Sequence, residues 1–184
     1  MITMVDTQLL KQARRLEKRA LTEIYDRYNH DLYRYAMRAL GDPDRAEECV
    51  AETFSRLLHA LKRGGGPKDH LRAYLYRTAH NWLTDQYRRQ PPPSVTLDDI
   101  QLAGEGSLSK SVEQSQEQAR VRHALATLTA DQQQVILLKY YEGWSNKAVA
   151  EVLGKPVGAI KSLQHRALKA LKRALLQAEK ELIQ

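Results

Sequence analysis

The chain has 184 residues, a length that fits one or two small domains with modest cores. Lysine and arginine outnumber aspartate and glutamate by 29 to 22, and the resulting net charge of +7 and pI near 9.5 favour a polyanionic partner. The single cysteine, Cys49, excludes an internal disulfide framework and fits a reducing compartment. The sequence has neither an apolar run of membrane-spanning length nor a secretory signal, so we expect a cytoplasmic protein without membrane insertion.

The first part of the chain predicts helices joined by tight turns. Residues 1–16 are expected to be a frayed lead-in, and residues 21–40 carry a helical stripe of apolar side chains. Gly41 ends this helix, Asp42 caps the next one and Pro43 opens it. The stripe consists of Ile24, Tyr25, Tyr28, Leu32, Tyr35, Ala36 and Leu40.

Two more helices complete the predicted first domain, residues 1–89. The helix after Pro43 turns apolar residues inward and three carboxylates, Glu47, Glu48 and Glu52, outward, and a glycine run followed by Pro67 ends it. A third helix follows Asp69 and ends near Arg89. Three helices with short turns predict a compact all-helical domain. The inward positions of the third helix are Leu71, Leu75, Thr78, Ala79, Trp82 and Leu83.

The third helix has a second face that mixes cations, an amide and aromatic rings. Such a mixture suits an unstacked nucleic-acid strand, because aromatic rings and arginine stack on bases and asparagine reads their edges. The alternative is aromatic packing at the edge of the core beside solvated arginines, and the helix taken alone favours this alternative. The candidate strand-binding residues are Tyr76, Arg77, His80, Asn81, Arg88 and Arg89.

Composition changes abruptly at residue 90. Three consecutive prolines open a stretch rich in glycine, serine and aspartate, so residues 90–111 are interpreted as an interdomain linker. An amphipathic helix over residues 112–128 is expected to follow, with Val121, Leu125 and Leu128 inward. Asp131 is expected to cap a helix over residues 132–141.

The second predicted domain, residues 112–184, contains a helix-turn-helix. Ser145 is placed to cap a short helix over residues 146–153, Gly154 ends it, and Pro156 starts a longer helix. A short helix, a glycine turn and a longer helix in this order are typical of the motif.

The longer helix divides into an apolar arc and a basic arc when it advances by about 100° per residue. Val157, Ile160, Ala167, Leu168, Leu171 and Leu175 form the apolar arc. On the basic side, cations can donate to phosphates and base acceptors, and a small first-turn residue lets backbone approach a phosphate. An isolated helix of this kind is as readily a lysine-rich surface helix, but the preceding short helix and turn favour DNA. The candidate duplex-binding residues are Gly158, Lys161, Ser162, His165, Arg166 and Lys169.

No catalytic or metal-binding pattern is present in the sequence. The six histidines are scattered without a Cys-x-x-Cys or His-Glu-x-x-His set, and no glycine loop has phosphate-binding spacing. We therefore expect no enzymatic activity, no catalytic residue, no metal, no cofactor and no small-molecule substrate.

Several segments, in order and spacing, resemble an extracytoplasmic-function (group IV) sigma factor of bacterial RNA polymerase, in the sigma-70 family. Residues 21–40 and 46–54 resemble the start of region 2 and its polymerase-binding segment. Residues 71–81 and 85–89 resemble the segment that melts and reads the −10 element. Residues 125–171, with Glu142-Gly143-Trp144-Ser145, resemble region 4, which reads the −35 element.

The resemblance implies an all-α protein with a region 2-like and a region 4-like domain, and it implies a role for each candidate residue. Its partners would be the core polymerase, at the largest-subunit clamp helices and the flap, then promoter DNA, and an anti-sigma factor. The strand-binding residues would hold the opened −10 strand, and the duplex-binding residues would enter the −35 major groove. The polymerase-binding residues would be Asp42, Glu47, Glu48 and Glu52.

Three positions depart from the family pattern. Ala51 stands where a glutamine is usual in the polymerase-facing segment, and Pro156 replaces a capping serine or threonine. Leu163-Gln164 reverses a common cationic-then-apolar order, which places Gln164 on the inward arc. These departures bear on −35 preference and on one polymerase contact.

Two other functional classes remain open from sequence. One is a stand-alone helix-turn-helix regulator that binds duplex DNA without polymerase. The other is a sigma-like interaction module without initiation activity, for which the basic residues of the last helix would be dispensable.

Overall fold

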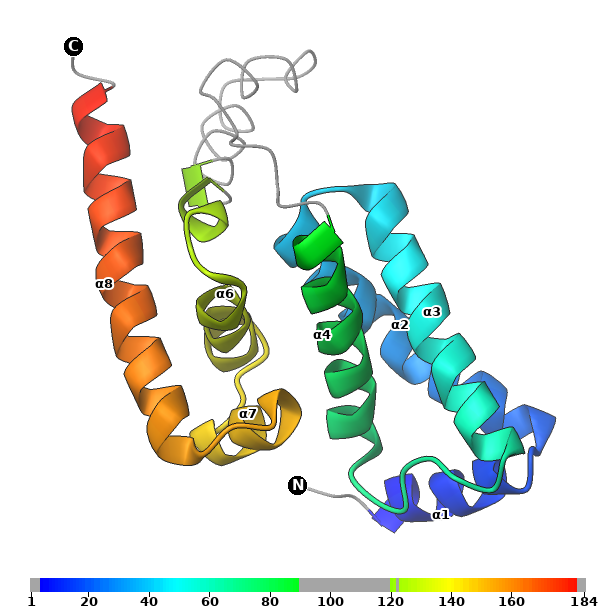
Figure 1. Ribbon diagram of the computed structural model, residues 1–184. Helices are drawn as coiled ribbons and strands as arrows, with labels where there is room; N and C mark the ends of the chain where they lie inside the picture. The colour runs from blue at the N-terminus through cyan, green and yellow to red at the C-terminus, as the bar shows by residue number, and fades with distance from the viewer. Residues whose placement is uncertain (1–3, 90–119, 122, 182–184) are drawn as a thin grey trace.

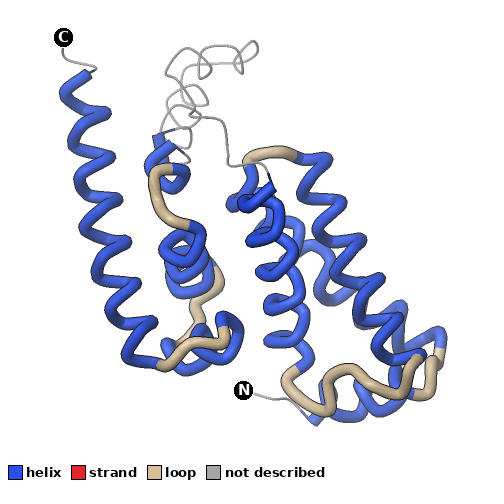
Figure 2. The backbone as a smooth tube through the Cα atoms, viewed as in Figure 1, coloured by secondary structure: helices blue, strands red, loops and turns tan. Residues whose placement is uncertain are grey.

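The computed structural model describes residues 4–89, 120, 121 and 123–181. Within these ranges the regular elements are all helical (Figure 2), which confirms the predicted all-α class. The predicted linker, residues 90–111, and the first part of the helix predicted over residues 112–128 lie outside the described residues. Residues 120, 121 and 123–126 are helical in the structure, and Leu125 in this helix and Leu128 just after it are buried.

Helix α1 (Met4–Arg14) replaces the frayed lead-in that the sequence predicted. It buries Leu9, Leu10 and Ala13 against the rest of the first domain. Three buried positions in one short helix are too few to give a clear periodic signal, and the prediction was therefore wrong. The guanidinium of Arg14 fastens the helix by donating hydrogen bonds of 3.1 Å to the carbonyls of Gly65 and Pro67.

Helices α2 (Lys18–Leu40) and α3 (Pro43–Lys62) meet at the predicted turn. Gly41 adopts a φ of 70°, and its N–H donates to the carbonyl of Met37 at 2.8 Å. A side-chain oxygen of Asp42 accepts a 3.1 Å hydrogen bond from the N–H of Arg45, which confirms the predicted cap. Tyr25, predicted to point inward, is 47% exposed, because α3 reaches only one side of its ring, where Phe54 lies 4.9 Å away.

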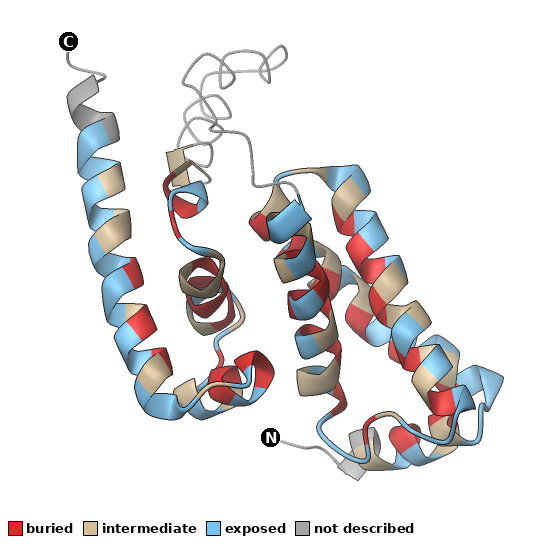
Figure 3. Ribbon diagram, viewed as in Figure 1, coloured by how far each residue is buried: buried red, intermediate tan, exposed pale blue. Residues whose placement is uncertain are grey.

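Helix α4 (Leu71–Arg89) completes the first domain beside α2 and α3 (Figure 1). Its predicted inward residues Leu71, Leu75, Ala79, Trp82 and Leu83 are buried, and Thr78 is half-buried. The apolar sides of α2, α3 and α4 face one another (Figure 3), so the periodicity of the sequence placed this core correctly.

The second domain contains α6 (Ala130–Ile136), a π-helical turn η2 (Leu137–Tyr141), α7 (Asn146–Leu153) and α8 (Val157–Glu181). The cap of α6 is Thr129, whose hydroxyl accepts from the N–H of Gln132 while the Gln132 side chain accepts from the N–H of Thr129. The prediction that Asp131 caps this helix was wrong, because Thr129 already has the extended backbone of a capping residue. Asp131 instead pairs with Lys155 at 3.1 Å.

The π-helical turn determines the direction in which the residues after it point. A π turn spaces its hydrogen bonds one residue wider than an α-helix does, and such turns often occur at functional sites. Here Leu137 and Leu138 are both fully buried. The chain then turns at Gly143, with a φ of 68°, and the N–H of Trp144 donates to the carbonyl of Leu138 at 3.0 Å. Glu142 and Trp144 are thereby directed toward the first domain.

The two domains pack against each other. Helices α6 and α7 contact α4, the π turn contacts α2, and buried residues of both domains form one continuous apolar cluster. Figure 1 shows α6 and α7 between α4 and the long helix α8.

Helix α8 is buried only along its first half. Ile160, Leu163 and Ala167 are buried, whereas Leu168 and Leu175, predicted to point inward, are 43% and 38% exposed. Val157, also predicted inward, is 39% exposed. The later turns of α8 extend past α6 (Figure 1), so within the described residues little lies against them.

Gln164 does not occupy the inward position that the sequence predicted. It is half-buried and its side-chain amide donates to the hydroxyl of Tyr140 at 2.8 Å. Leu163 is the buried member of the pair.

Candidate nucleic-acid interface

The helix-turn-helix predicted from the sequence is present in the second domain. The hydroxyl of Ser145 accepts a 3.2 Å hydrogen bond from the N–H of Ala148 at the start of α7. Gly154 ends α7 with a φ of 62°, a conformation that costs glycine little. Helix α8 starts directly after Pro156, whose carbonyl accepts from the N–H of Ile160 at 3.1 Å. Val149 and Ile160, both fully buried, fix the two helices against each other.

The six candidate duplex-binding residues share one exposed face of α8. Two of them are held by local contacts: the Ser162 hydroxyl donates to the carbonyl of Gly158 at 3.1 Å, and Arg166 Nε donates to the carbonyl of Ser162 at 3.4 Å. Among the residues that the structure describes, no carboxylate pairs with the cations of this face. Their charge is therefore available to phosphates. The face consists of Gly158, Lys161, Ser162, His165, Arg166 and Lys169.

The candidate strand-binding residues of α4 do not share one exposed face. Arg77, Asn81, Arg88 and Arg89 are exposed, but Tyr76 and His80 are 0% and 7% exposed. In this arrangement of the domains Tyr76 and His80 are therefore covered, and the assignment of all six residues to a nucleic-acid strand stays a prediction. The second domain covers the middle of that face, which periodicity within α4 could not reveal.

Tyr76 is covered by the segment that precedes α7. Its hydroxyl donates to the carboxylate of Glu142 at 2.6 Å, and the ring of Trp144 lies 5.0 Å from its ring. Burial, together with the hydrogen bond to Glu142, raises the pKa of Tyr76 well above its ordinary value. The phenol is therefore a neutral donor at physiological pH.

His80 lies between α4 and the second domain. Burial lowers its pKa below the ordinary value of 6.5, Lys155 lowers it further, and Asp131 acts in the opposite direction. One helical turn away, the guanidinium of Arg77 donates to the backbone carbonyl of Glu151 in α7. The burial of His80 and the hydrogen bond of Arg77 both join α4 to the domain that carries α8.

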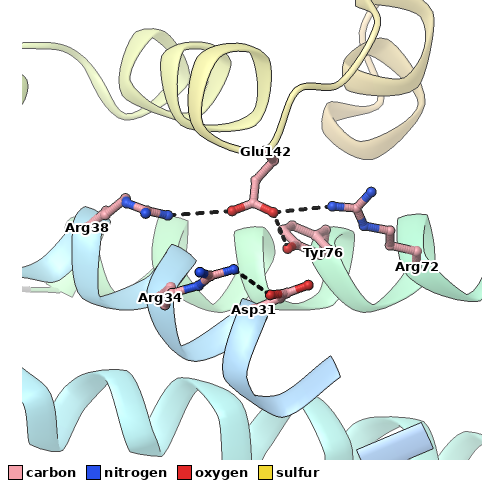
Figure 4. Close-up of polar contacts among 6 residues, drawn as sticks. All are labelled: Asp31, Arg34, Arg38, Arg72, Tyr76 and Glu142. Atoms are coloured by element: carbon pink, nitrogen blue, oxygen red, sulfur yellow. Dashed lines mark hydrogen bonds and ion pairs between the residues drawn. The ribbon is translucent and has the colours of Figure 1, made fainter. Parts of the chain in front are cut away.

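Glu142 is a buried interdomain residue whose role the sequence did not indicate. Its side chain is 6% exposed and lies between two arginines of the first domain (Figure 4). Its carboxylate oxygens lie 3.7 Å from Arg38 and 3.3 Å from Arg72. The guanidinium of Arg72 also stacks 4.7 Å from the ring of Trp144, so one arginine contacts both residues.

Two glutamines of α6 are further interdomain residues that the sequence analysis missed. Gln133 accepts from the hydroxyl of Tyr87 at 2.5 Å and donates to the carbonyl of Ala39 at 3.3 Å. Gln134 accepts from the hydroxyl of Tyr35. Both glutamines are buried, and two amides beside an apolar run were the sequence signal for a polar contact between packed elements.

The candidate polymerase-binding carboxylates lie on or beside α3. Glu47 and Glu48 are exposed, Asp42 caps the helix, and Glu52 pairs with Arg56 at 2.7 Å. Two carboxylates are thus available to a partner, while the other two also serve the helix itself. Ala51, the departure from the family pattern, is exposed on this helix.

Within the described residues, two further kinds of feature are absent, a metal centre and a membrane-spanning helix. They hold no group of three His, Cys, Asp or Glu side chains arranged to bind a metal ion. None of their helices combines the length and apolar character that crossing a membrane requires.

Comparisons with known proteins identify both halves of the chain. The family model for sigma-70 region 2 matches residues 24–91, and the model for sigma-70, region 4 matches residues 118–171. The ECF RNA polymerase sigma factor SigL of Mycobacterium tuberculosis is 32% identical over 86% of this chain and 90% of its own length.

Solved structures agree with these matches. CnrH in complex with the cytosolic domain of CnrY has a TM-score of 0.70 and 29% identity, over 94% of this chain and 97% of that chain. The fold is also that of the sigma factor RpoE in complex with the anti-sigma factor NepR from Bartonella quintana. That match has a TM-score of 0.60 and 24% identity, over 84% of this chain and 95% of that one.

Proposed function

This chain belongs to the extracytoplasmic-function family of RNA polymerase sigma factors, and we propose on that premise that it reads promoter DNA with two separate surfaces. It is an alternative sigma factor, a protein that directs transcription initiation. Core polymerase contacts DNA mainly through phosphates, so a subunit that adds base contacts supplies the choice of promoter.

The exposed basic face of α8 is the observation that carries this proposal. It is presented by a capped short helix and a glycine turn, and the described carboxylates leave its cations unpaired. In the −35 major groove, Lys161 and Arg166 donate to phosphates and guanine acceptors, and Ser162 and His165 contact base edges. Gly158 and Lys169 approach the phosphate backbone of the DNA at either end of this contact.

The −10 strand is held by α4 in this proposal. Arg77, Arg88 and Arg89 contact the strand, Asn81 reads a base edge, and Tyr76 and His80 contribute once the second domain has moved away. The exposed carboxylates of α3 dock on the largest-subunit clamp of the polymerase, and the second domain meets the flap. The polymerase-binding residues are Asp42, Glu47, Glu48 and Glu52.

The remaining features follow from this role. The protein works in the cytoplasm as a non-enzymatic subunit, with no cofactor or small-molecule substrate. An anti-sigma factor is its inhibitory partner. This assignment is supported by the family resemblance and by CnrH, whose structure is a complex with the cytosolic domain of CnrY.

Runoff transcription with purified core polymerase tests the proposal. A pool of genomic promoter fragments from the source bacterium is transcribed with core enzyme alone and with core enzyme plus this protein. We expect specific transcripts only when the protein is added. Binding to duplex DNA without any polymerase-dependent transcript would instead identify a stand-alone regulator. If the protein neither binds duplex DNA nor yields transcripts, it is an interaction module.

A further inference from the structure

The face of α4 assigned to the −10 strand is occupied by the second domain of the same chain. Tyr76 and His80 are buried there, and Arg77 is engaged by the carbonyl of Glu151. A strand cannot stack on Tyr76 while the Trp144 ring lies 5.0 Å from it. DNA and the second domain therefore compete for one surface.

Polar contacts hold the second domain on this surface. Glu142 takes a hydrogen bond from Tyr76 and lies between Arg38 and Arg72, as Figure 4 shows. These polar groups can be hydrated after separation, although the rings of Tyr76 and Trp144 would be exposed as well. The Nδ1 of His80 and the Nε1 of Trp144 are buried without a hydrogen-bond partner among the described residues, and both gain water on opening.

We propose that Glu142 is a latch that keeps the free protein in a closed form, in which the second domain covers the −10 surface of α4. The latch joins the loop before α7 to the two arginines and the tyrosine of the first domain. The free chain then has low affinity for single-stranded DNA. A partner that holds the two domains apart, such as core polymerase, uncovers α4. The DNA-binding role of α4 in this inference rests on the proposed function. The closed form rests on the contacts of Glu142 and not on that function.

Charge reversal at the latch tests the closed form. Glu142→Arg places a cation between Arg38 and Arg72 and should separate the domains. Trp82 and Trp144 are 5% and 7% exposed, so the wild-type protein should resist quenching by acrylamide. We expect the variant to show a newly quenchable tryptophan and a larger radius of gyration in small-angle scattering. If Trp144 is the tryptophan that opening exposes, the quenchable signal should be lost when Trp144→Phe is added to Glu142→Arg.

Matched variants separate the latch from a general effect of charge. Asp31→Arg removes the exposed pair with Arg34 in the same part of the first domain (Figure 4) and should leave tryptophan quenching unchanged. Adding Arg38→Glu and Arg72→Glu to Glu142→Arg mirrors the charges and should restore closure at least in part. If Glu142→Arg loses its helical circular dichroism, Glu142→Gln decides, because it keeps the size of the side chain and removes both ion pairs.

The DNA measurement uses a fluorescent single-stranded oligonucleotide of mixed sequence and no polymerase. The Glu142→Arg protein should bind it at least about fivefold more tightly than wild type, the lower range of coupling between sites. Unchanged quenching and scattering in a folded Glu142 variant would overturn the latch. Domain opening without tighter binding would keep the latch and overturn the assignment of α4 to the strand.

Discussion

The ring of Trp144 lies 5.0 Å from the ring of Tyr76, so a residue just before α7 completes the burial of a residue in the middle of α4. Tyr76 in turn lies 5.1 Å from the ring of Tyr35 in α2. Tilted aromatic pairs at such distances contribute about 0.5–1.5 kcal/mol beyond the area that they bury. The three rings therefore couple the stability of the first domain to the position of the second.

Truncating this aromatic contact should destabilise the protein measurably. Trp144→Ala removes a side chain that is 7% exposed, and we expect the free energy of unfolding to decrease by about 3 kcal/mol, within the range for buried aromatic truncations. Urea denaturation followed by circular dichroism measures this change. Leu176→Ala, at a position 47% exposed, is the control and should change stability by less than about 0.5 kcal/mol. Equal effects of the two variants would contradict the packing role of Trp144.

His80 should make the protein less stable in mild acid. Burial lowers its pKa in the folded protein below 6.5, the ordinary value that the unfolded chain retains. Above pH 6.5 both forms are neutral at this residue and it has no effect. As the pH falls below 6.5 the unfolded chain binds the proton first, so stability is lost by up to about 1.4 kcal/mol per pH unit until the lowered pKa is reached.

Urea denaturation between about pH 7.5 and pH 5.5 measures this loss, in a range above most carboxylate titrations. His80→Gln should flatten the dependence, whereas His59→Gln, at an exposed position, should leave it as in wild type. Lys155→Gln should weaken the effect of His80, because Lys155 contributes to the lowering of its pKa. A wild-type slope that survives His80→Gln would assign the pH dependence to another group.

Local features of the sequence predicted local structure well. The caps at Asp42 and Ser145 and the turns at Gly41 and Gly154 were confirmed, because each depends only on residues within one helical turn. Helical periodicity also located the core of α2, α3 and α4. The same reasoning placed the helix-turn-helix and the exposed basic face of α8.

Periodicity failed where burial depends on a distant partner. It identifies an apolar face but not whether another element covers it, and so Leu168 and Leu175 were predicted inward although α8 extends past α6. Conversely, Tyr76 and His80 lie on the polar side of α4 and are buried by residues more than fifty positions away. Glu142, a charged residue in a turn, gave no sequence signal for the two arginines that surround it.

Asp42 should have two separable roles. Its side chain caps α3, so Asp42→Ala should lower the free energy of unfolding by about 1 kcal/mol, as measured by urea denaturation. Asp42→Asn keeps an acceptor oxygen for the cap and should leave stability close to wild type. If the charge of Asp42 also contacts core polymerase, Asp42→Asn should weaken binding to that enzyme in fluorescence anisotropy. Equal polymerase affinity for Asp42→Asn and wild type would restrict this residue to its capping role.

The basic face of α8 should control the salt dependence of duplex binding. Lys161→Ala with Arg166→Ala removes two exposed cations, and each phosphate contact contributes about 0.9 to the slope of log K against log salt concentration. Anisotropy with a duplex carrying the −35 element of a runoff-defined promoter should show this slope reduced by about 1.8 in magnitude. Lys172→Ala with Arg173→Ala removes the same charge from the same side of α8, but in its later turns beyond the six residues of the face, and should change the slope by less. If the two double variants lose the same amount of slope and of promoter preference, binding reflects the overall charge of the protein, and α8 does not read the groove.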